Sequence, residues 1–305
     1  MARILTDLKD LFRRGNVLTR FVYVNVAVFV VVGLVNVILG LFNRGFAQGF
    51  DFLALPASMS RFVLQPWSVV TYMFMHAGVM HILFNMLWLY WFGQIFLLFF
   101  SARHFRGLYF LGGILGGALY MLAYNVFPYF STHVDYALLV GASASVLAIA
   151  TASAYREPNY PIQLLLIGTV KLKYLALFMV VTDLLFMTSG NAGGHISHLG
   201  GALAGLWFAD SLQKGSDRTL WINRLADAVA RLFDSASWHR KPKMKVHRGG
   251  KNGRQKGKYH NPNFKVYDAH EEEEKINRIL EKVKKSGYES LTQDEKKTLF
   301  DASRK

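Results

Sequence analysis

Long apolar blocks occupy most of the chain up to residue 212. Six of them approach or reach the roughly 20 apolar residues that a helix needs to cross a bilayer. A soluble domain would instead break its apolar residues into short periodic runs. The pattern therefore predicts an all-α, polytopic membrane protein with six transmembrane helices, at Phe21–Phe42, His81–Phe100, Phe105–Phe127, Leu138–Tyr155, Tyr174–Thr188 and Ile196–Leu212.

Small and polar residues interrupt the last three stretches, which favours a packed bundle over simple membrane anchors. The charged N-terminal segment MARILTDLKDLFRRGN leads directly into the first stretch without a cleavage site, so we expect no signal peptide. The chain contains no cysteine, which excludes disulfides and thiol catalysis.

Basic residues set the expected orientation, because loops rich in Lys and Arg stay on the cytoplasmic side. With six crossings, and leaving the C-terminal tail aside, ten Lys and Arg fall on the side of both termini and two on the other. We therefore expect a multi-pass protein of the cell (inner) membrane with both termini in the cytoplasm. The ten are Arg3, Lys9, Arg13, Arg14, Arg20, Arg103, Arg106, Arg156, Lys171 and Lys173, and the two are Arg44 and Arg61.

Composition divides the chain into four expected parts. They are a membrane domain at 1–213, an amphipathic juxtamembrane helix at 214–239, a basic flexible linker at 240–265 and a small cytoplasmic helical hairpin at 266–305. Residues after 213 hold 23 of the 35 Lys and Arg. Beside a membrane domain such a charge favours anionic lipid headgroups, and we expect no nucleic-acid partner.

Local patterns refine the C-terminal parts. In Leu220–Phe233 the apolar residues share one helical face, which suits a helix on the inner membrane surface or one packed on the tail. Hairpin helices are expected at His270–Lys285 and Gln293–Ser303. Gly287 would end the first, and Thr292 with Glu295 would form a capping box for the second.

The connection from Asn43 to Pro66 is long, aromatic and apolar, yet too short to cross the membrane twice. We expect it to lie partly embedded in the outer interface, with an ordinary extracellular loop as the alternative.

Unusual polar residues gather at one expected depth. His76, His81 and Asn85 open the second stretch, Ser143 lies about five residues into the fourth, and His198 opens the sixth. All three stretches run inward, so these residues lie on the order of 10 Å below the outer face, at a helical rise of ~1.5 Å per residue. Polar side chains at membrane depth face a bundle interior or a water-filled cavity.

These residue types suit serine hydrolysis, which needs a nucleophile, a base and donors for the oxyanion. Ser143 supplies a hydroxyl and His198 a base. His81 and Asn85 stand at positions i and i+4, so they project from one helical face as oxyanion donors, together with a backbone N–H near the serine.

Small residues accompany the serine and the histidine. Gly141, Ala142 and Ala144 flank Ser143 and allow close approach to it. Gly201 and Gly205 form a GxxxG pair on the sixth stretch that would admit the fourth closely.

Three of these segments, HAGVMHILFN at His76–Asn85, GASAS at Gly141–Ser145 and HLGGALAG at His198–Gly205, resemble the rhomboid family of intramembrane serine proteases in order and spacing. The resemblance covers roughly residues 15–212 and implies a six-transmembrane-helix fold with a Ser–His dyad in a water-filled cavity open to the extracellular side.

By position, the resemblance implies that Ser143 is the nucleophile and His198 the general base. It makes His81 and Asn85 part of the oxyanion hole and His76 a structural or supporting residue. It further implies tight packing at Gly112/Gly116 and Gly113/Gly117.

Two positions depart from the family pattern. Ala144 stands where a glycine usually follows the nucleophile, and we expect activity to survive because alanine is small. Ser68 follows Trp67 where an arginine is usual, which puts the loop-anchoring role of that arginine in doubt.

Two ionisable neighbours are lesser candidates. His195 is expected to be a loop or cavity-rim residue, and the alternative makes it the base. Asp183 would serve as a triad acid only if it reached the level of the histidines, and it is expected to lie several turns too deep. The histidines lack oxygen ligands for a metal, so no metal site is expected.

The sequence therefore predicts an intramembrane serine endopeptidase that cleaves transmembrane substrates near the outer membrane face and needs no cofactor. The alternative is a catalytically inactive relative that binds transmembrane segments as a chaperone or sorting factor. A transporter is disfavoured because no inverted repeats are evident.

Overall fold

The computed structural model describes residue 12 and residues 15–42, 47–164, 167–233 and 269–302. The chain divides into two compact units, Met1–Arg240 and Lys241–Lys305. The predicted basic linker and most of the N-terminal charged segment lie outside the described residues.

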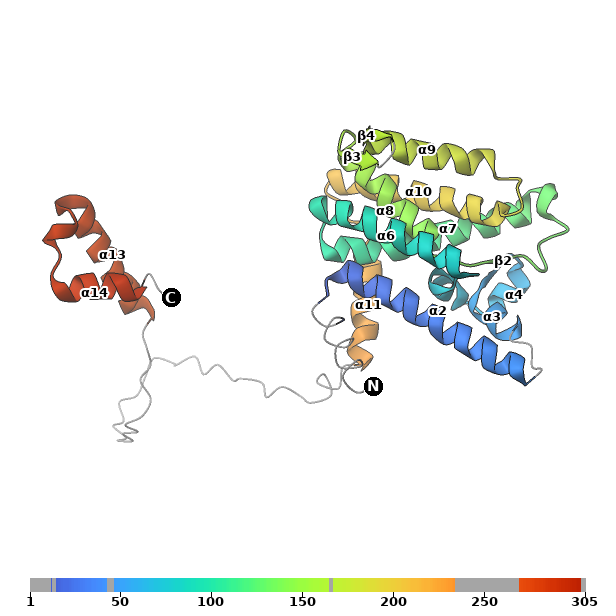
Figure 1. Cartoon of the computed structure of the whole chain (residues 1–305), viewed down its shortest axis with the longest axis horizontal. Coiled ribbons are helices and arrows are strands. Elements are labelled where there is room, and N and C mark those ends of the chain that lie inside the picture. The colour runs from blue at the N-terminus through green and yellow to red at the C-terminus, as the bar shows by residue number, and fades with distance from the viewer. Residues whose placement is uncertain (1–11, 13–14, 43–46, 165–166, 234–268, 303–305) are drawn as a thin grey trace, which may run out of the picture. The chain divides into compact units, whose positions relative to one another are not determined.

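Six helices of the first unit overlap the six predicted stretches and form an elongated bundle (Figure 1). Three of them, α2, α6 and α7, are long and apolar enough to cross a membrane by length and composition. The six are α2 (Val17–Leu41), α6 (Val79–Phe99), α7 (Ala102–Val126), α8 (Ser143–Arg156), α9 (Leu172–Leu185) and α10 (Ala192–Gln213).

The fourth predicted helix starts later than expected. Leu138–Leu139 form strand β2, which pairs antiparallel with β1 (Leu55–Pro56), and α8 begins only at Ser143. Gly141 has a φ of 123°, in the region that favours glycine, and its N–H donates to the carbonyl of Tyr72 at 2.9 Å. Pairing with β1 and the turn at Gly141 hold the segment before Ser143 in an extended form.

Close helix packing holds the centre of the bundle together. Helix α8 is buried from Ala144 to Ala154 and packs against α7 and α10. A Cβ added at Gly201 would overlap the carbonyl of Ala144, and one at Gly205 would overlap the carbonyl of Ala148. The predicted GxxxG contact between the fourth and sixth stretches is therefore confirmed.

The glycines of α7 also make the predicted close contacts. A Cβ on any of the four would come within 3 Å of a neighbouring side chain, so side chains there would clash. The neighbours are Ala148 for Gly112, Met73 for Gly113, Ala144 for Gly116 and Leu55 for Gly117.

The connection between α2 and α6 folds into short elements that pack against the bundle. They are α3 (Ala47–Leu53), β1, α4 (Met59–Leu64), α5 (Ser68–Thr71) and the 3-10 turn η1 (Tyr72–Phe74).

An arginine other than the usual one anchors this connection. Arg61 donates to the carbonyl of Asp135 at 3.0 Å and lies 3.7 Å from the carboxylate of Asp51. Trp67 donates to the carbonyl of Phe52 at 2.9 Å, while Ser68 is fully buried. The loop is thus tied down without an arginine at position 68.

Two short connections complete the first unit. Turn η2 (Pro128–Phe130) follows α7. Between α8 and α9, strands β3 (Pro161–Leu164) and β4 (Gly168–Lys171) pair antiparallel, with Pro161 opposite Lys171 and Leu164 opposite Gly168.

Helix α11 (Leu220–Phe233) crosses one end of the bundle at a steep angle to the other helices (Figure 1). Its polar side is held by α7, where Arg106 donates to Asn223 at 2.8 Å and pairs with Asp227 at 2.7 Å. The predicted apolar face points away from that contact, since Trp221 is 54% exposed and Leu225 60% exposed.

The second unit contains the predicted hairpin of helices, α13 (Ala269–Ser286) and α14 (Gln293–Ala302), with the 3-10 turn η3 (Tyr288–Ser290) between them. Gly287 ends α13 with a φ of 77°. The capping box is confirmed, because the Thr292 N–H donates to Glu295 at 2.8 Å and the Glu295 N–H to the Thr292 hydroxyl at 3.4 Å. The Thr292 N–H and then Lys282 hold the pKa of Glu295 below its usual range.

The contact at Gly201 generates a stability prediction. Gly201→Ala places a methyl group against the backbone of α8, and we expect destabilisation of about 1–3 kcal/mol, the usual cost of overpacking. Thermal unfolding of the purified protein in detergent measures the effect.

Gly33→Ala in α2 is the matched control, because nothing lies within 4 Å of a Cβ there. Alanine favours a helix over glycine, so this variant should unfold at the same or a higher temperature. Equal unfolding temperatures for the two variants would contradict the close contact between Gly201 and the backbone of α8.

Candidate active site

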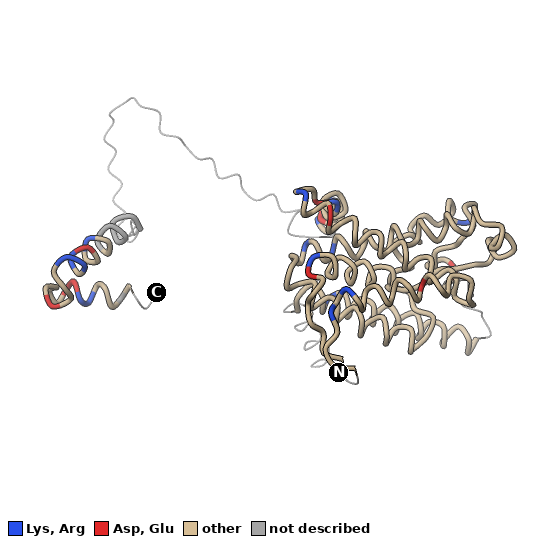
Figure 2. The backbone as a smooth tube through the Cα atoms, turned by 90° about the horizontal axis from the view of Figure 1, so that it is seen from above, with Lys and Arg blue, Asp and Glu red and all other residues tan. Residues whose placement is uncertain are grey.

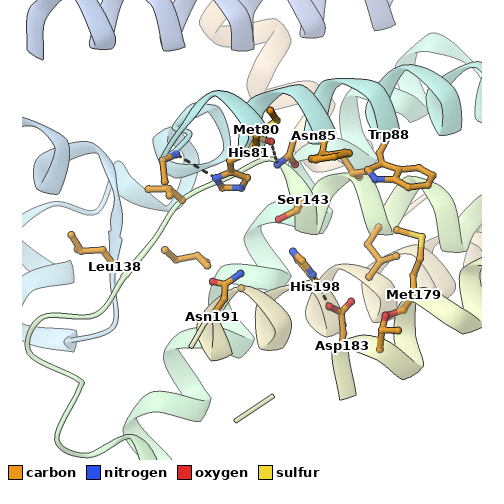
Figure 3. Close-up of a pocket in the computed structure, with 18 residues that line it drawn as sticks. Met80, His81, Asn85, Trp88, Leu138, Ser143, Met179, Asp183, Asn191 and His198 are labelled. Atoms are coloured by element: carbon orange, nitrogen blue, oxygen red, sulfur yellow. Dashed lines mark hydrogen bonds and ion pairs between the residues drawn. The ribbon is translucent and has the colours of Figure 1, made fainter. Parts of the chain in front are cut away.

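A cavity of about 690 Å³ opens among α6, the segment before α8, and helices α8, α9 and α10 (Figure 3). Four of the predicted site residues line it: His81 and Asn85 from α6, Ser143 from α8 and His198 from α10. Three helices distant in the sequence therefore bring the predicted nucleophile, base and oxyanion donors to one space. Their chemical roles stay predictions.

Ser143 is the first residue of α8. It does not lie about five residues inside the helix, as the sequence predicted. The first N–H groups of an α-helix have no acceptor within the helix. The N–H of Ser143 belongs to this group and is available to an anion beside the hydroxyl.

His81 and Asn85 share one face of α6, as their spacing predicts. The N–H of Ala77 donates to Nδ1 of His81 at 3.3 Å, and Nδ2 of Asn85 donates to the carbonyl of His81 at 2.9 Å. When Nδ1 of a neutral histidine accepts a hydrogen bond, Nε2 carries the proton. Nε2 of His81 is therefore a donor.

Gly141 brings this donor close to the serine. A Cβ at this position would stand 2.8 Å from Nε2 of His81 and 3.6 Å from the hydroxyl oxygen of Ser143. The glycine is thus required twice, for its positive φ and for the space between the histidine and the serine.

Asp183 does not lie too deep, and the sequence expectation is wrong on this point. Helix α9 ends at Leu185, so Asp183 lies in its last turn, where its Oδ1 accepts a hydrogen bond from Nδ1 of His198 at 2.8 Å. The signal in the sequence that could have predicted this contact is a lone acid in an apolar stretch, because ionisable residues within membrane helices need a partner.

His195 is part of helix α10 and not of a loop. Its Nδ1 also lies 2.8 Å from Oδ1 of Asp183, so one carboxylate oxygen serves two imidazoles. The ligand atoms of these three residues all lie within 4.8 Å of one another. The expectation that the histidines lack an oxygen ligand is therefore wrong. Among the described residues, these three side chains are the group that could hold a metal ion.

His76 lies outside the main cavity, against a second space of about 610 Å³ beside α2. Its buried ring meets the ring of His81 edge-on, with centroids 5.2 Å apart. This contact fits the supporting role that the resemblance implies, because it limits how the His81 ring can turn.

Ala144, the departure beside the nucleophile, faces away from the cavity. A Cβ at Gly116 of α7 would come within 2.6 Å of its methyl group. The side chain therefore packs into the space left by a glycine and does not line the cavity.

This bundle of apolar helices, with a serine and two histidines lining an internal cavity, is that of a membrane protein. The model of the Rhomboid domain matches residues 63–214, which include all the site residues named above, and the chain is a member of the rhomboid family. Residues 267–305 match a family of unknown function (DUF6576).

The chain is also similar to "RHOMBOID-like protein 12, mitochondrial" of Arabidopsis thaliana, with 29% identity over 202 residues. The match covers 62% of this chain and 60% of the relative. Family membership supports an intramembrane protease or a rhomboid-like protein without assigning an activity.

The position of Gly141 generates a prediction about the site. Gly141→Ala forces a side chain into a backbone conformation that L-residues rarely adopt and against the His81 ring. If the chain cleaves peptide bonds with His81 as an oxyanion donor, this variant should lose activity on the order of 10²-fold, the usual cost of losing one such donor. The cleavage rate of a transmembrane substrate in detergent measures it.

Gly215→Ala is the control for the backbone effect alone, since Gly215 has a φ of 80° and open space around its Cβ. It should lower stability somewhat and leave cleavage intact. Full activity of Gly141→Ala would show that the His81 ring does not need this gap.

Proposed function

We propose that this protein is an intramembrane serine endopeptidase, with Ser143 as nucleophile and His198 as general base. The observation that carries the proposal is that Ser143 and His198, from helices far apart in sequence, line the same cavity with the paired donors His81 and Asn85. The glycine contacts between α8 and α10 let the backbones of the two helices lie close together, which supports this pairing.

The residues suit acyl transfer in two steps. Nε2 of His198 accepts the Ser143 proton as the oxygen adds to a peptide carbonyl, and the same proton then goes to the leaving amine. The developing oxyanion accepts hydrogen bonds from Nε2–H of His81, the amide of Asn85 and the N–H of Ser143. Water then attacks the acyl-enzyme, with His198 again as base, and releases the carboxylic acid and the free serine.

Helix length supports the expected depth. Helix α8 runs 14 residues from Ser143 to Arg156, about 20 Å at a rise of ~1.5 Å per residue. If Arg156 marks the inner edge of a hydrocarbon core of about 30 Å, Ser143 lies on the order of 10 Å below the outer edge. Water therefore has to enter the cavity from the outer side.

The apolar walls of the cavity suit a transmembrane substrate. Phe84 and Trp88 line it from α6, and Met179 lines it from α9. A hydrogen-bonded helix cannot present its carbonyl to a nucleophile, so the substrate must be extended at the cleavage site. We therefore expect small or helix-breaking residues there.

Charge placement supports both termini in the cytoplasm. Lys and Arg of the first unit gather mainly at the end of the bundle where α11 lies (Figure 2). This is the end that the positive-inside rule places in the cytoplasm, and it is opposite to the start of α8.

An inactive, substrate-binding rhomboid-like protein is the second candidate. The apolar cavity that would hold a substrate for cleavage would also hold a transmembrane segment that is not cleaved. The two candidates differ in whether the Ser143 hydroxyl reacts.

Labelling with a fluorophosphonate probe in detergent separates them. Ser143→Ala and His198→Ala should abolish labelling and lower cleavage by about 10³-fold or more, because each removes one member of a unit that acts together. Ser145→Ala is the matched control, since Ser145 lies buried on the same helix and does not line the cavity.

Equal labelling of the wild type and Ser143→Ala would refute this nucleophile. Absence of both labelling and cleavage in a folded wild-type protein would favour the binding role.

We also propose that α11 rests on the cytoplasmic membrane surface, with its apolar face toward lipid. The polar residues Asn223 and Asp227 are occupied by α7, while Leu225 and Leu232 are 60% and 71% exposed. Arginines on the helix would meet anionic headgroups.

The absence of cysteine makes this testable by single-site spin labels. In bilayers containing anionic lipid, a label at Leu225→Cys should be accessible to oxygen and shielded from a water-soluble nickel chelate. A label at Arg224→Cys should show the opposite pattern. Equal exposure of both labels to the chelate would disprove the lipid contact.

A further inference from the structure

We propose that Asp183 is a positioning residue that acts through His198, so that the site works as a Ser143–His198–Asp183 triad and not as a dyad. This inference rests on the proposed protease function. It concerns a residue whose contact with His198 the sequence pattern did not predict.

The hydrogen bonds of the carboxylate carry the inference. Oδ1 of Asp183 lies 2.8 Å from Nδ1 of His198 and 2.8 Å from Nδ1 of His195. Asp183 is 6% exposed, and within the described part of the chain its recorded ion-pair partners are these two imidazoles. A carboxylate buried among apolar helices is costly without such partners, so its presence here requires a function or a strong structural need.

The arrangement determines which nitrogen of His198 acts as the base. A carboxylate oxygen only accepts hydrogen bonds, so Nδ1 of His198 must carry a proton. In the neutral ring Nε2 then holds the lone pair. His198 lies between Ser143 and Asp183 (Figure 3), so one side of the ring faces the serine and the other side meets the carboxylate.

The carboxylate also stabilises the charged intermediate. When Nε2 takes the Ser143 proton, the ring becomes an imidazolium whose charge faces Asp183 across a short hydrogen bond. Because Asp183 is 6% exposed, this interaction is stronger than it would be in water. In this step Asp183 accepts the hydrogen bond and transfers no proton.

His195 has a different part in this network. It stands one turn before His198 on α10 and does not line the cavity. Its bond to the same oxygen keeps the carboxylate turned toward α10. We therefore expect His195 to hold Asp183 in place, with a smaller effect on the reaction than Asp183 itself.

Asp183→Asn is the decisive variant, because it keeps the shape and removes the charge. We expect kcat to fall on the order of 10³-fold, with KM little changed, since the carboxylate contacts His198 and not the substrate. In a His198→Ala background the same change should cause no further loss, which a merely structural role would not predict.

Asp210→Asn is the matched control. Asp210 also bonds to neighbours, the Tyr155 hydroxyl at 3.0 Å and Lys214 at 2.7 Å, but lies near the other end of α10. Its activity should equal that of the wild type.

The outcomes separate the possibilities. Full kcat in Asp183→Asn, together with loss of activity in Ser143→Ala, would overturn the triad and leave the protease function standing. Retained activity in Ser143→Ala would instead refute the protease mechanism. Loss of wild-type activity on chelator treatment, restored by Zn²⁺, would assign the three side chains to a metal and overturn the inference.

A second measurement applies if Asp183→Asn fails to fold. ¹⁵N-histidine NMR of the wild-type protein, with His198 assigned by comparison with His198→Gln, reports the tautomer directly. Protonation at Nδ1 of His198 is expected, and protonation at Nε2 alone would overturn the inference.

Discussion

The close contact between α8 and α10 is the constraint on which the rest of the site depends. Gly201 and Gly205 let the backbone of α10 meet the backbone of α8, with no side chain between them. Across this contact the Thr151 hydroxyl lies within hydrogen-bond distance of the Ala202 carbonyl, at 3.1 Å. Within lipid the hydrophobic effect does not drive helices together, so such short contacts and hydrogen bonds must hold the bundle. A wider spacing would move His198 away from Ser143.

A second requirement is that α8 begins in the interior of the bundle and not at its edge. Pairing of β2 with β1, and the bond from Gly141 to Tyr72, satisfy backbone groups that would otherwise lack partners inside the bundle. The connection between α2 and α6 therefore does more than join two helices, because it supplies strand β1, which pairs with β2 just before α8 begins. This is how a serine comes to stand at a helix start, where free N–H groups are available.

The carboxylate of Asp183 shows how a charge is tolerated among apolar helices. It is buried at the end of α9 and meets two imidazoles of the neighbouring helix, each at 2.8 Å. Burial makes these hydrogen bonds strong and also makes their loss costly. The same carboxylate therefore links the packing of α9 to the orientation of the His198 ring.

The sequence by itself determined the six helices, the candidate residues Ser143 and His198 and the glycine contacts, because apolar length, residue type and i, i+4 spacing are local properties. Only the tertiary structure decided three further points: that α8 starts at Ser143, that Ala144 faces Gly116, and that Asp183 reaches His198. Each depends on how far one element is rotated or shifted along another. Contacts between segments distant in the chain set this rotation and shift, so no local sequence pattern can predict them.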